Sequence, residues 1–206
     1  MTILTFPTIR RPSSASYRLR GNTQTHRSPL DGTVQTLEMP GANWELTVSW
    51  ESLNSDDMRV LAAFLADLRG TAGRFYYSPA TWAPRRAAGG GSPLINGASQ
   101  SGSTLATDGW SFAVQVMRAG DWLSYTDTSG RRRLHMVTAD TSSTGGGAAS
   151  LPITPPIRRA GADNAAIDVA TPSGVFRLPT DDAPEMQLRP PMLGAASLTM
   201  VEALVG

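Results

Sequence analysis

The chain has 206 residues, a formal net charge of +1, no cysteine and two histidines. This length suffices for one ordinary domain or two small ones, and 40% hydrophobic with 17% charged residues excludes a charge-dominated disordered chain. The near-neutral charge also argues against nucleic-acid readout, which needs a basic surface that neutralises phosphates.

The sequence contains no lysine, and all 18 of its cationic residues are arginine. Schiff-base catalysis, pyridoxal-phosphate anchoring and the phosphate-binding lysines of kinases and phosphate loops are therefore excluded. The absence of cysteine excludes thiolate nucleophiles, disulfides and sulfur-ligated zinc. No secretory signal and no apolar stretch of the ~20 residues that span a bilayer is recognisable, so we expect no membrane insertion and a soluble subunit.

Short strands separated by turns are predicted for the first forty residues. The candidate strands cover residues 2–6, 17–20 and 33–39. Before the last of these, Pro29-Leu30-Asp31-Gly32 is a strong turn signal, because proline presets the second turn position and glycine accepts a positive φ. The pattern predicts a β region from the start of the chain.

The clearest predicted strand covers residues 44–50. Trp44, Leu46, Val48 and Trp50 alternate with polar residues, which is the period of a strand rather than a helix. One face of the predicted sheet should therefore be buried, and the other should be solvated or in contact with a partner.

One helix is predicted, over residues 56–69. Asn54 or Ser55 can cap it, acidic residues occupy its first turn, and Gly70 can end it. Its apolar stripe should pack across the strand at 44–50. The stripe consists of Met58, Leu61, Phe64, Leu65 and Leu68.

A linker is predicted at residues 85–93, where three consecutive glycines interrupt any periodicity. Beyond a strand at 74–77 and this linker, candidate strands at 112–116, 122–125 and 134–138 alternate with turns at a spacing typical of a small barrel or sandwich. The Ser/Thr/Gly tract 141–149 is predicted to be a flexible loop, although a neighbour could also order it.

The prolines that follow predict short or edge strands, since proline cannot donate to a central ladder. The last segment, 197–204, is apolar enough to form a strand that returns to the N-terminal sheet. We therefore predict a mainly β fold with one α-helix. Residues 1–90 together with 192–206 form one β domain, and residues 94–190 form an inserted small β-barrel-like domain.

No catalytic, cofactor-binding or metal-binding residue is predicted. His26 and His135 are the possible histidine bases, and neither lies in a triad motif. The glycine stretches 89–91 and 144–147 lack the lysine and helix of a nucleotide loop, and no calcium-loop spacing occurs. Paired carboxylates could hydrolyse glycosides, but a helix start and a turn explain several of them. The candidates are Asp56, Asp57, Asp121, Asp127, Asp140, Asp181 and Asp182.

Arginine clusters and tryptophans leave two interpretations each. The arginines are either solvated turns and edges or inter-subunit salt bridges, for which the planar guanidinium is well suited. The tryptophans Trp82, Trp110 and Trp122 are either core or interface anchors, or a platform for sugars. The arginine clusters are Arg10-Arg11, Arg85-Arg86, Arg131-Arg132-Arg133 and Arg158-Arg159.

A family resemblance connects these features. The helix and the strand after it carry a run of residues that follows the tryptophan-rich strand: Leu61, Phe64, Leu65, Leu68, Arg69, Gly70, Gly73 and Phe75. Residues 96–102, Gly120-Asp121, Pro155-Pro156-Ile157-Arg158 and the terminal segment with Glu202 extend the pattern. The arrangement resembles tail-tip proteins of long-tailed bacteriophages, most closely the distal tail (baseplate ring) class and related minor tail proteins.

The resemblance implies a tail-tube-like β-sandwich or barrel domain in a virion protein that is made in the host cytoplasm. Such proteins form hexameric rings between the tail tube and the baseplate hub, often with a second β domain. We therefore expect a structural protein rather than an enzyme. The alternative is a carbohydrate-binding module that stacks a host glycan on Trp110, Trp122 and Tyr125. A small glycosidase or peptidase is a third possibility.

Overall fold

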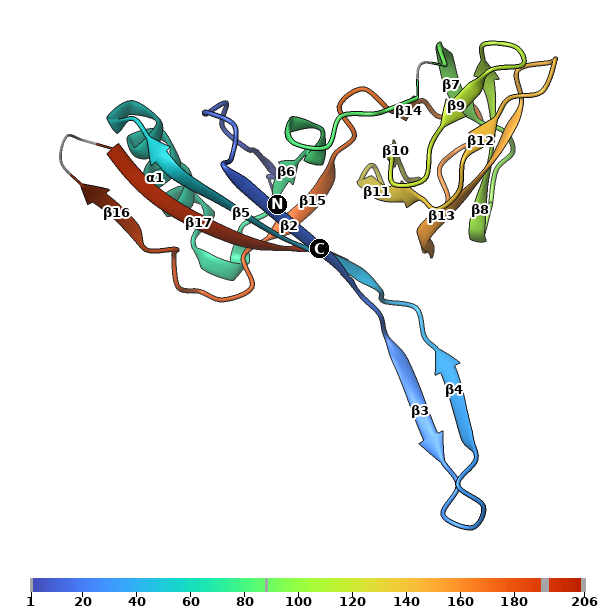
Figure 1. Ribbon diagram of the computed structural model, residues 1–206, viewed down its shortest axis with the longest axis horizontal. Coiled ribbons are helices and arrows are strands. Elements are labelled where there is room, and N and C mark those ends of the chain that lie inside the picture. Colours follow the sequence, from blue (N-terminus) through green and yellow to red (C-terminus); the bar gives the residue numbers. More distant parts are fainter. Residues whose placement is uncertain (1, 88, 190–192, 205–206) are drawn as a thin grey trace.

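The computed structural model describes residues 2–87, 89–189 and 193–204, and the chain is mainly β, as predicted. An open sheet and a small barrel lie side by side, and a long hairpin projects away from both (Figure 1). We call the hairpin, residues 23–38, the arm. The rest of the chain therefore covers much of the surface of the sheet and the barrel, but little of the surface of the arm.

The open sheet has the strand order β1-β6-β15-β17-β5-β2, with β16 added beside β17. In its centre, β17 and β5 run antiparallel with Met200 opposite Leu46, which confirms that the C-terminal segment returns to the N-terminal sheet. The strands are β1 (Leu4–Thr5), β2 (Ser14–Arg20), β5 (Asn43–Leu53), β6 (Phe75–Tyr77), β15 (Gly174–Arg177), β16 (Met186–Arg189) and β17 (Leu193–Glu202).

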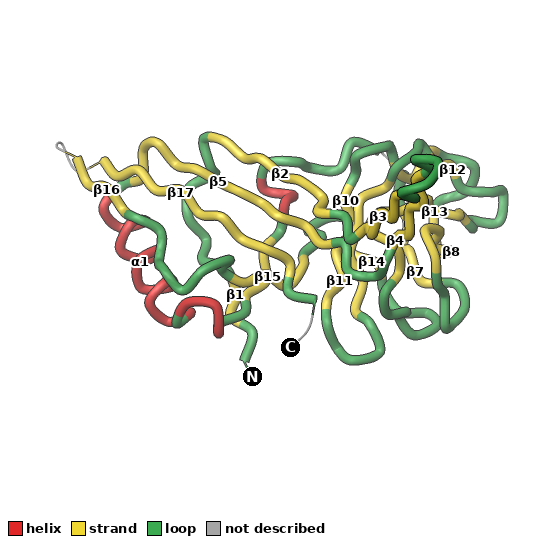
Figure 2. The backbone as a smooth tube through the Cα atoms, turned by 90° about the horizontal axis from the view of Figure 1, so that it is seen from below, coloured by secondary structure: helices red, strands yellow, loops and turns green. Residues whose placement is uncertain are grey.

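The helix α1 (Ser55–Leu68) covers one face of this sheet. Asn54 caps it, because its side-chain oxygen accepts a hydrogen bond from the Asp57 N–H at 2.7 Å. Four residues of the predicted stripe and the alternating apolar residues of β5 are buried in one core cluster, and Phe64 packs against it partly buried. Figure 2 shows α1 (red) along the sheet, at the end away from the barrel. No helix in the described ranges is long and apolar enough to cross a membrane.

The end of α1 differs slightly from the prediction. Arg69, rather than Gly70, is the first residue in the left-handed conformation, with a φ of 52°, and Gly70 follows with a φ of 66°. The chain then continues through the short 3-10 helix η1 (Gly70–Ala72), β6 and a second 3-10 turn, η2 (Pro79–Thr81).

The barrel has the strand order β14-β10-β11-β13-β8-β7. Its first and last strands meet: Leu94 bridges Ala166, and the Ile95 N–H donates to the Ala165 carbonyl at 2.9 Å. The small pair β9 (Gln115–Met117) and β12 (Thr141–Ser142) is attached to it. The barrel strands are β7 (Gly91–Ile95), β8 (Gly102–Trp110), β10 (Trp122–Thr126), β11 (Arg132–Val137), β13 (Ala149–Ile157) and β14 (Ile167–Asp168).

The predicted C-terminal boundary of the inserted domain, residue 190, is too late in the chain. Its barrel strands end with β14, whereas β15 and β16 pair with β17 of the open sheet. The prolines at 172, 179 and 184 flank β15 and β16 rather than interrupting them. The prolines predicted short or edge strands in this region, but they did not show that these strands return to the first sheet.

Two other local predictions were wrong. The tract 141–149 contains β12 and a turn in which the Thr144 N–H donates to the Ala148 carbonyl at 2.8 Å, so the chain itself orders it. The nine-residue β13 lies inside the barrel sheet despite its prolines. Its pairing with β8 shifts register between Pro152 and Ile157, and Pro155 and Pro156 lie in that break, where no ladder donor is needed.

Candidate functional site

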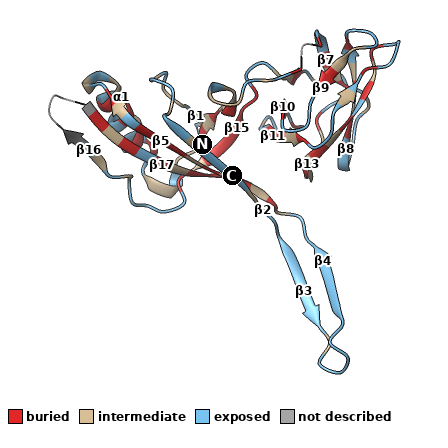
Figure 3. Ribbon diagram, in the orientation of Figure 1, coloured by how far each residue is buried: buried red, intermediate tan, exposed pale blue. Residues whose placement is uncertain are grey.

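The arm is a two-stranded ribbon with no core of its own. It consists of β3 (Thr23–Arg27) and β4 (Val34–Glu38), which pair antiparallel with Thr25 opposite Thr36. Every residue of both strands is exposed (Figure 3, pale blue). An isolated two-stranded hairpin is marginally stable at best in water, and its unpaired edges invite pairing with another chain. The arm is therefore the part of the molecule that would gain most stability from pairing with another chain.

The turn at the tip of the arm is well specified by its sequence. The Ser28 N–H donates to the Thr33 carbonyl at 2.8 Å, and Gly32 takes the predicted positive φ of 73°. Hydrogen bonds from Ser28 and Thr33 lower the pKa of Asp31 to about 2. Leu30, in contrast, is 96% exposed. A structured tip thus presents an apolar side chain to solvent.

A groove of about 560 Å³ lies at the base of the arm. The arm base contributes Met39, Pro40 and Ala42 to its lining, and β13 of the barrel contributes Pro156 and Ile157. Glu38 lies at the same groove, and Leu204, near the C-terminal end of the chain, completes its apolar lining. We call it the basal groove. It is a mostly apolar hollow between the arm, the barrel and the open sheet.

A buried ion pair fixes the barrel wall of this groove to the sheet. Arg158 Nη2 donates to Glu202 Oε1 at 2.6 Å, and Arg158 Nη1 donates to the Ala42 carbonyl. Glu202 Oε2 accepts from the Trp44 N–H at 3.2 Å. Burial raises the pKa of Glu202, although Arg158 and the Trp44 N–H act in the opposite direction. The base of the arm is therefore tied to both domains through a few charged contacts.

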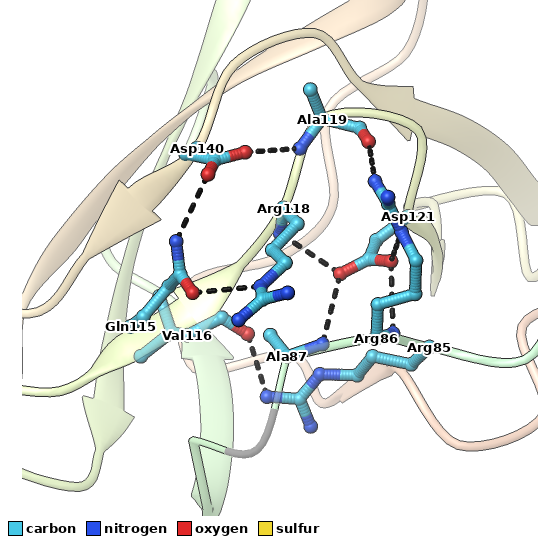
Figure 4. Close-up of polar contacts among 9 residues, drawn as sticks. All are labelled: Arg85, Arg86, Ala87, Gln115, Val116, Arg118, Ala119, Asp121 and Asp140. Atoms are coloured by element: carbon cyan, nitrogen blue, oxygen red, sulfur yellow. Dashed lines mark hydrogen bonds and ion pairs between the residues drawn. The ribbon is translucent and has the colours of Figure 1, made fainter.

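A second charged cluster ties the predicted linker to the barrel (Figure 4). Asp121, which is buried, accepts hydrogen bonds from the Arg118 N–H at 2.8 Å and the Arg86 N–H at 3.0 Å. Arg86 also donates to the Ala119 carbonyl, and Arg85 donates to the Val116 carbonyl at 2.6 Å. The segment at 85–87 is therefore anchored and does not act as a free linker.

Most arginines of the predicted clusters make contacts with other parts of the same chain. Arg132 donates to Ser173 Oγ at 2.7 Å and lies over the Tyr76 ring, 4.9 Å from its centroid, so it too joins barrel to sheet. Arg133 donates to Asp127 Oδ2 at 2.7 Å inside the barrel. Neither the solvated-turn interpretation nor the inter-subunit interpretation anticipated these contacts within the chain.

The two candidate histidines lie in different environments. His135 is buried, its Nδ1–H donates to the Pro155 carbonyl at 2.8 Å, and its ring stacks on Tyr125. Burial lowers the pKa of His135 to about 4, so the ring is neutral at pH 7. His26 lies on the exposed arm. Neither has a described contact with a serine or carboxylate side chain, so the structure does not bring a triad together in the described ranges.

The candidate carboxylates mostly organise turns. Asp127 accepts from the Ser129 N–H at 2.8 Å, and although burial acts to raise its pKa, hydrogen bonds from Ser129, Arg131 and Arg133 lower it. Asp140 accepts from the Ala119 N–H, and Asp181 accepts from the Thr71 N–H, which lowers the pKa of Asp181. Asp56 and Asp57 lie in the first turn of α1, as predicted. The described residues contain no acidic or histidine cluster that could hold a metal ion.

The aromatic platform proposed for a glycan is not available on the surface. Trp110, Trp122 and Tyr125 are all buried. Trp122 belongs to a barrel strand but packs edge-to-face against Trp44 of the sheet, with ring centroids 4.7 Å apart. Trp82 stands beside it in the same aromatic group. The core-anchor interpretation of these rings is therefore confirmed, and the sugar-stacking one was wrong.

A second hollow, of about 310 Å³, lies between the segment 5–12 and the sheet–barrel junction. Its lining includes Arg10, Arg11 and Arg132 beside apolar and aromatic side chains. Arg10 Nη1 already donates to the Ser52 carbonyl, and Arg132 is held by Ser173 and Tyr76. This hollow shows no set of free polar groups that converges on one ligand position.

No protein-family model matches the chain, and no curated protein matches it in sequence. The resemblance to phage tail-tip proteins therefore stays a prediction from the residues named above.

Strand β3 was missed by sequence reasoning. Its sequence, Thr-Gln-Thr-His-Arg, has no alternation of apolar and polar residues, because neither face of the arm is buried. The available signals were the turn sequence at 29–32 and the β-branched threonines on both sides of it.

Proposed function

We propose that this protein is a structural subunit of a bacteriophage tail tip, which assembles into a ring that joins the tail tube to the baseplate hub. The arm is the observation that carries the proposal. It extends two strands, exposed on both faces, away from a chain whose other strands pair in two sheets and a small strand pair. Such an element is stabilised when copies of the chain cover it.

A second feature supports assembly by strand pairing. In the open sheet, β2 pairs with β5 on one side and forms the edge of the sheet on the other. β3 follows β2 after two residues, so one free backbone edge runs from the sheet into the arm. Free edges of this kind invite further pairing, and a closed ring satisfies them for every copy.

The ring symmetry, the location in the virion and the neighbours in the tail come from the family resemblance. By that resemblance the ring is hexameric, and its partners are the tail-tube and hub proteins. The proposed role is one of binding and assembly, and requires no catalytic turnover. The barrel, whose strands close on themselves, would then be the outward domain, and the arm would be the element shared between copies.

The experiment is light scattering with size-exclusion chromatography over a wide concentration range, followed by negative-stain microscopy. We expect the full chain to form rings with interfaces well above ~1,000 Å². In the test variant Asn-Gly replaces residues 23–38. This loop can close because the Met39 N–H donates to the Asn22 carbonyl at 2.7 Å, so the two ends of the arm are adjacent.

The armless variant should be monomeric and retain the circular dichroism of the sheet and barrel. Phe112→Ser is the matched control, because Phe112 is a large apolar side chain, 69% exposed, on the barrel rather than the arm. This control should still form rings. A full chain that is monomeric at every concentration, or an armless variant that assembles as well as the full chain, would contradict the proposal.

A further inference from the structure

The two ends of the arm carry complementary features. At the tip, Leu30 is almost completely exposed. At the base, the basal groove offers an apolar hollow lined by Met39, Pro156 and Ile157. Burial of a leucine side chain in such a hollow is favourable because it removes apolar surface from water. The tip of the arm thus carries an exposed apolar side chain, and its base carries an apolar groove that could receive one.

The charges at the two ends are complementary as well. Arg27 lies at the tip, where its guanidinium is close to Gly32. Glu38 lies at the groove. Neither side chain has a hydrogen bond or ion pair within the described residues, although the chain pairs many of its other arginines. Because Thr23 is opposite Glu38 and positions 23 and 27 are four apart, Arg27 and Glu38 project from the same face of the ribbon.

A tip cannot reach the groove of its own chain. The tip turn precedes strand β4, whose five residues, Val34–Glu38, cover about 16 Å at ~3.3 Å per residue and so separate the turn from the groove residue Glu38. Figure 1 shows the arm leading straight away from the sheet and the barrel. An arm tip that occupies this groove must therefore come from a second copy of the chain.

We propose that the arm tip, Pro29-Leu30, inserts into the basal groove of the next copy, and that Arg27 pairs with Glu38 of that copy. This inference rests on the proposed function, because it specifies how the copies of the ring contact one another. The contact is head-to-tail, since it joins different surfaces on the two copies, and it closes into a ring when the rotation between copies allows. The arm length would then set the spacing between neighbours.

The first test is disulfide cross-linking, because the chain contains no cysteine of its own. Leu30→Cys with Pro156→Cys should give a ladder of covalent oligomers after mild oxidation. Leu30→Cys alone should give at most dimers, because each copy then has one thiol. Leu30→Cys with Ala162→Cys, at an exposed barrel turn, is the matched control and should give no ladder.

The second test is a charge swap, which does not depend on folding of the Pro156 variant. Arg27→Glu and Glu38→Arg should each weaken assembly by about tenfold, because each turns an attraction into a repulsion. The double variant Arg27→Glu/Glu38→Arg should restore the wild-type assembly constant. A merely structural role for either side chain would give no such recovery.

The outcomes separate the two proposals. If the wild-type chain forms rings but the Leu30/Pro156 pair gives no ladder and the charge swap does not recover, the tip-in-groove contact is wrong and the ring function stands. If the wild-type chain forms no oligomer, both are wrong. A ladder together with charge-swap recovery supports the tip-in-groove contact.

Discussion

The barrel and the open sheet with its arm differ in whether their outer strand edges are paired. In the barrel, β7 meets β14, so the strand edges are joined and most of the buried apolar residues lie inside one cluster. In the other region, the edge of β2 stays free and continues into an arm with no buried residue. A β region is therefore self-sufficient where its edges meet, and the place where closure fails is the best candidate for contact with other chains.

The two regions are nevertheless held firmly together. Trp122 and Leu134 of the barrel lie in the core cluster of the sheet, and Arg158 of the barrel pairs with Glu202 of the sheet. The junction therefore joins the barrel, whose strand edges are closed, to the open sheet, whose β2 edge is free. Variants at the junction should therefore affect stability strongly, and variants on the arm should affect assembly alone.

The largest effect is expected from Trp122→Ala. Trp122 is buried against Trp44 in the sheet core, so its removal should lower the free energy of unfolding by about 4 kcal/mol. Urea denaturation followed by circular dichroism measures this. Phe112→Ala, at an exposed ring, is the control and should change the unfolding free energy by less than ~0.5 kcal/mol. A loss for Trp122→Ala as small as that of the control would show that the two regions do not share a core.

Arg158→Met should have the next largest effect. It leaves the Glu202 carboxylate buried without its partner, which costs about 3 kcal/mol. Because burial already raises the pKa of Glu202, the loss should be smaller at pH 5 than at pH 7, as the carboxylate takes up a proton. Arg158→Met/Glu202→Gln should recover most of the stability at pH 7. Equal losses at both pH values, without recovery, would contradict this role for the ion pair.

His135 should make the barrel sensitive to acid. Its pKa is lowered to about 4 in the folded state against an ordinary value of 6.5, so the unfolded state binds more protons between these values. Stability should therefore fall as the pH falls from 6.5 to about 4, by at most about 3 kcal/mol. In the same scan, the difference between the wild type and His135→Gln isolates this contribution. Parallel profiles for the two proteins would contradict it.

The smallest effect on stability is expected from Leu37→Ser in the arm. Leu37 is 60% exposed, so the free energy of unfolding of the monomer should change by less than ~0.5 kcal/mol. Ring formation, measured by light scattering, should weaken, since copies would bury this side chain. A destabilised monomer would mean that the arm packs on its own chain.

Local patterns in the sequence predicted β5 and α1, which are each buried on one side. The alternation in β5 and the stripe of α1 are produced by the core that they share, and the Asn54 cap satisfies backbone donors close in sequence. Strand β15 pairs with the distant β6, where Phe176 lies opposite Phe75, and β16 pairs with β17 of the same sheet. Turn and proline signals do not show these pairings, so the predicted domain boundary was too late.

The candidate site was harder to predict for the same reason. β3 is missed because a strand without a buried face has no periodic pattern. The basal groove joins residues 38–42 with 155–158 and 204, and no local pattern connects them. The sequence also marked Arg158 as part of a cluster, but its partner Glu202 becomes evident when the barrel is placed beside the sheet.

Amide hydrogen exchange in the dilute full chain and in the assembled ring tests whether neighbouring copies cover the arm. Barrel amides should be protected in both samples, because the strand edges of the barrel are closed. Amides of residues 23–38 should exchange rapidly in the dilute chain and become protected in the ring. An arm that is as protected in the monomer as in the assembly, or that stays unprotected in the ring, would contradict the account.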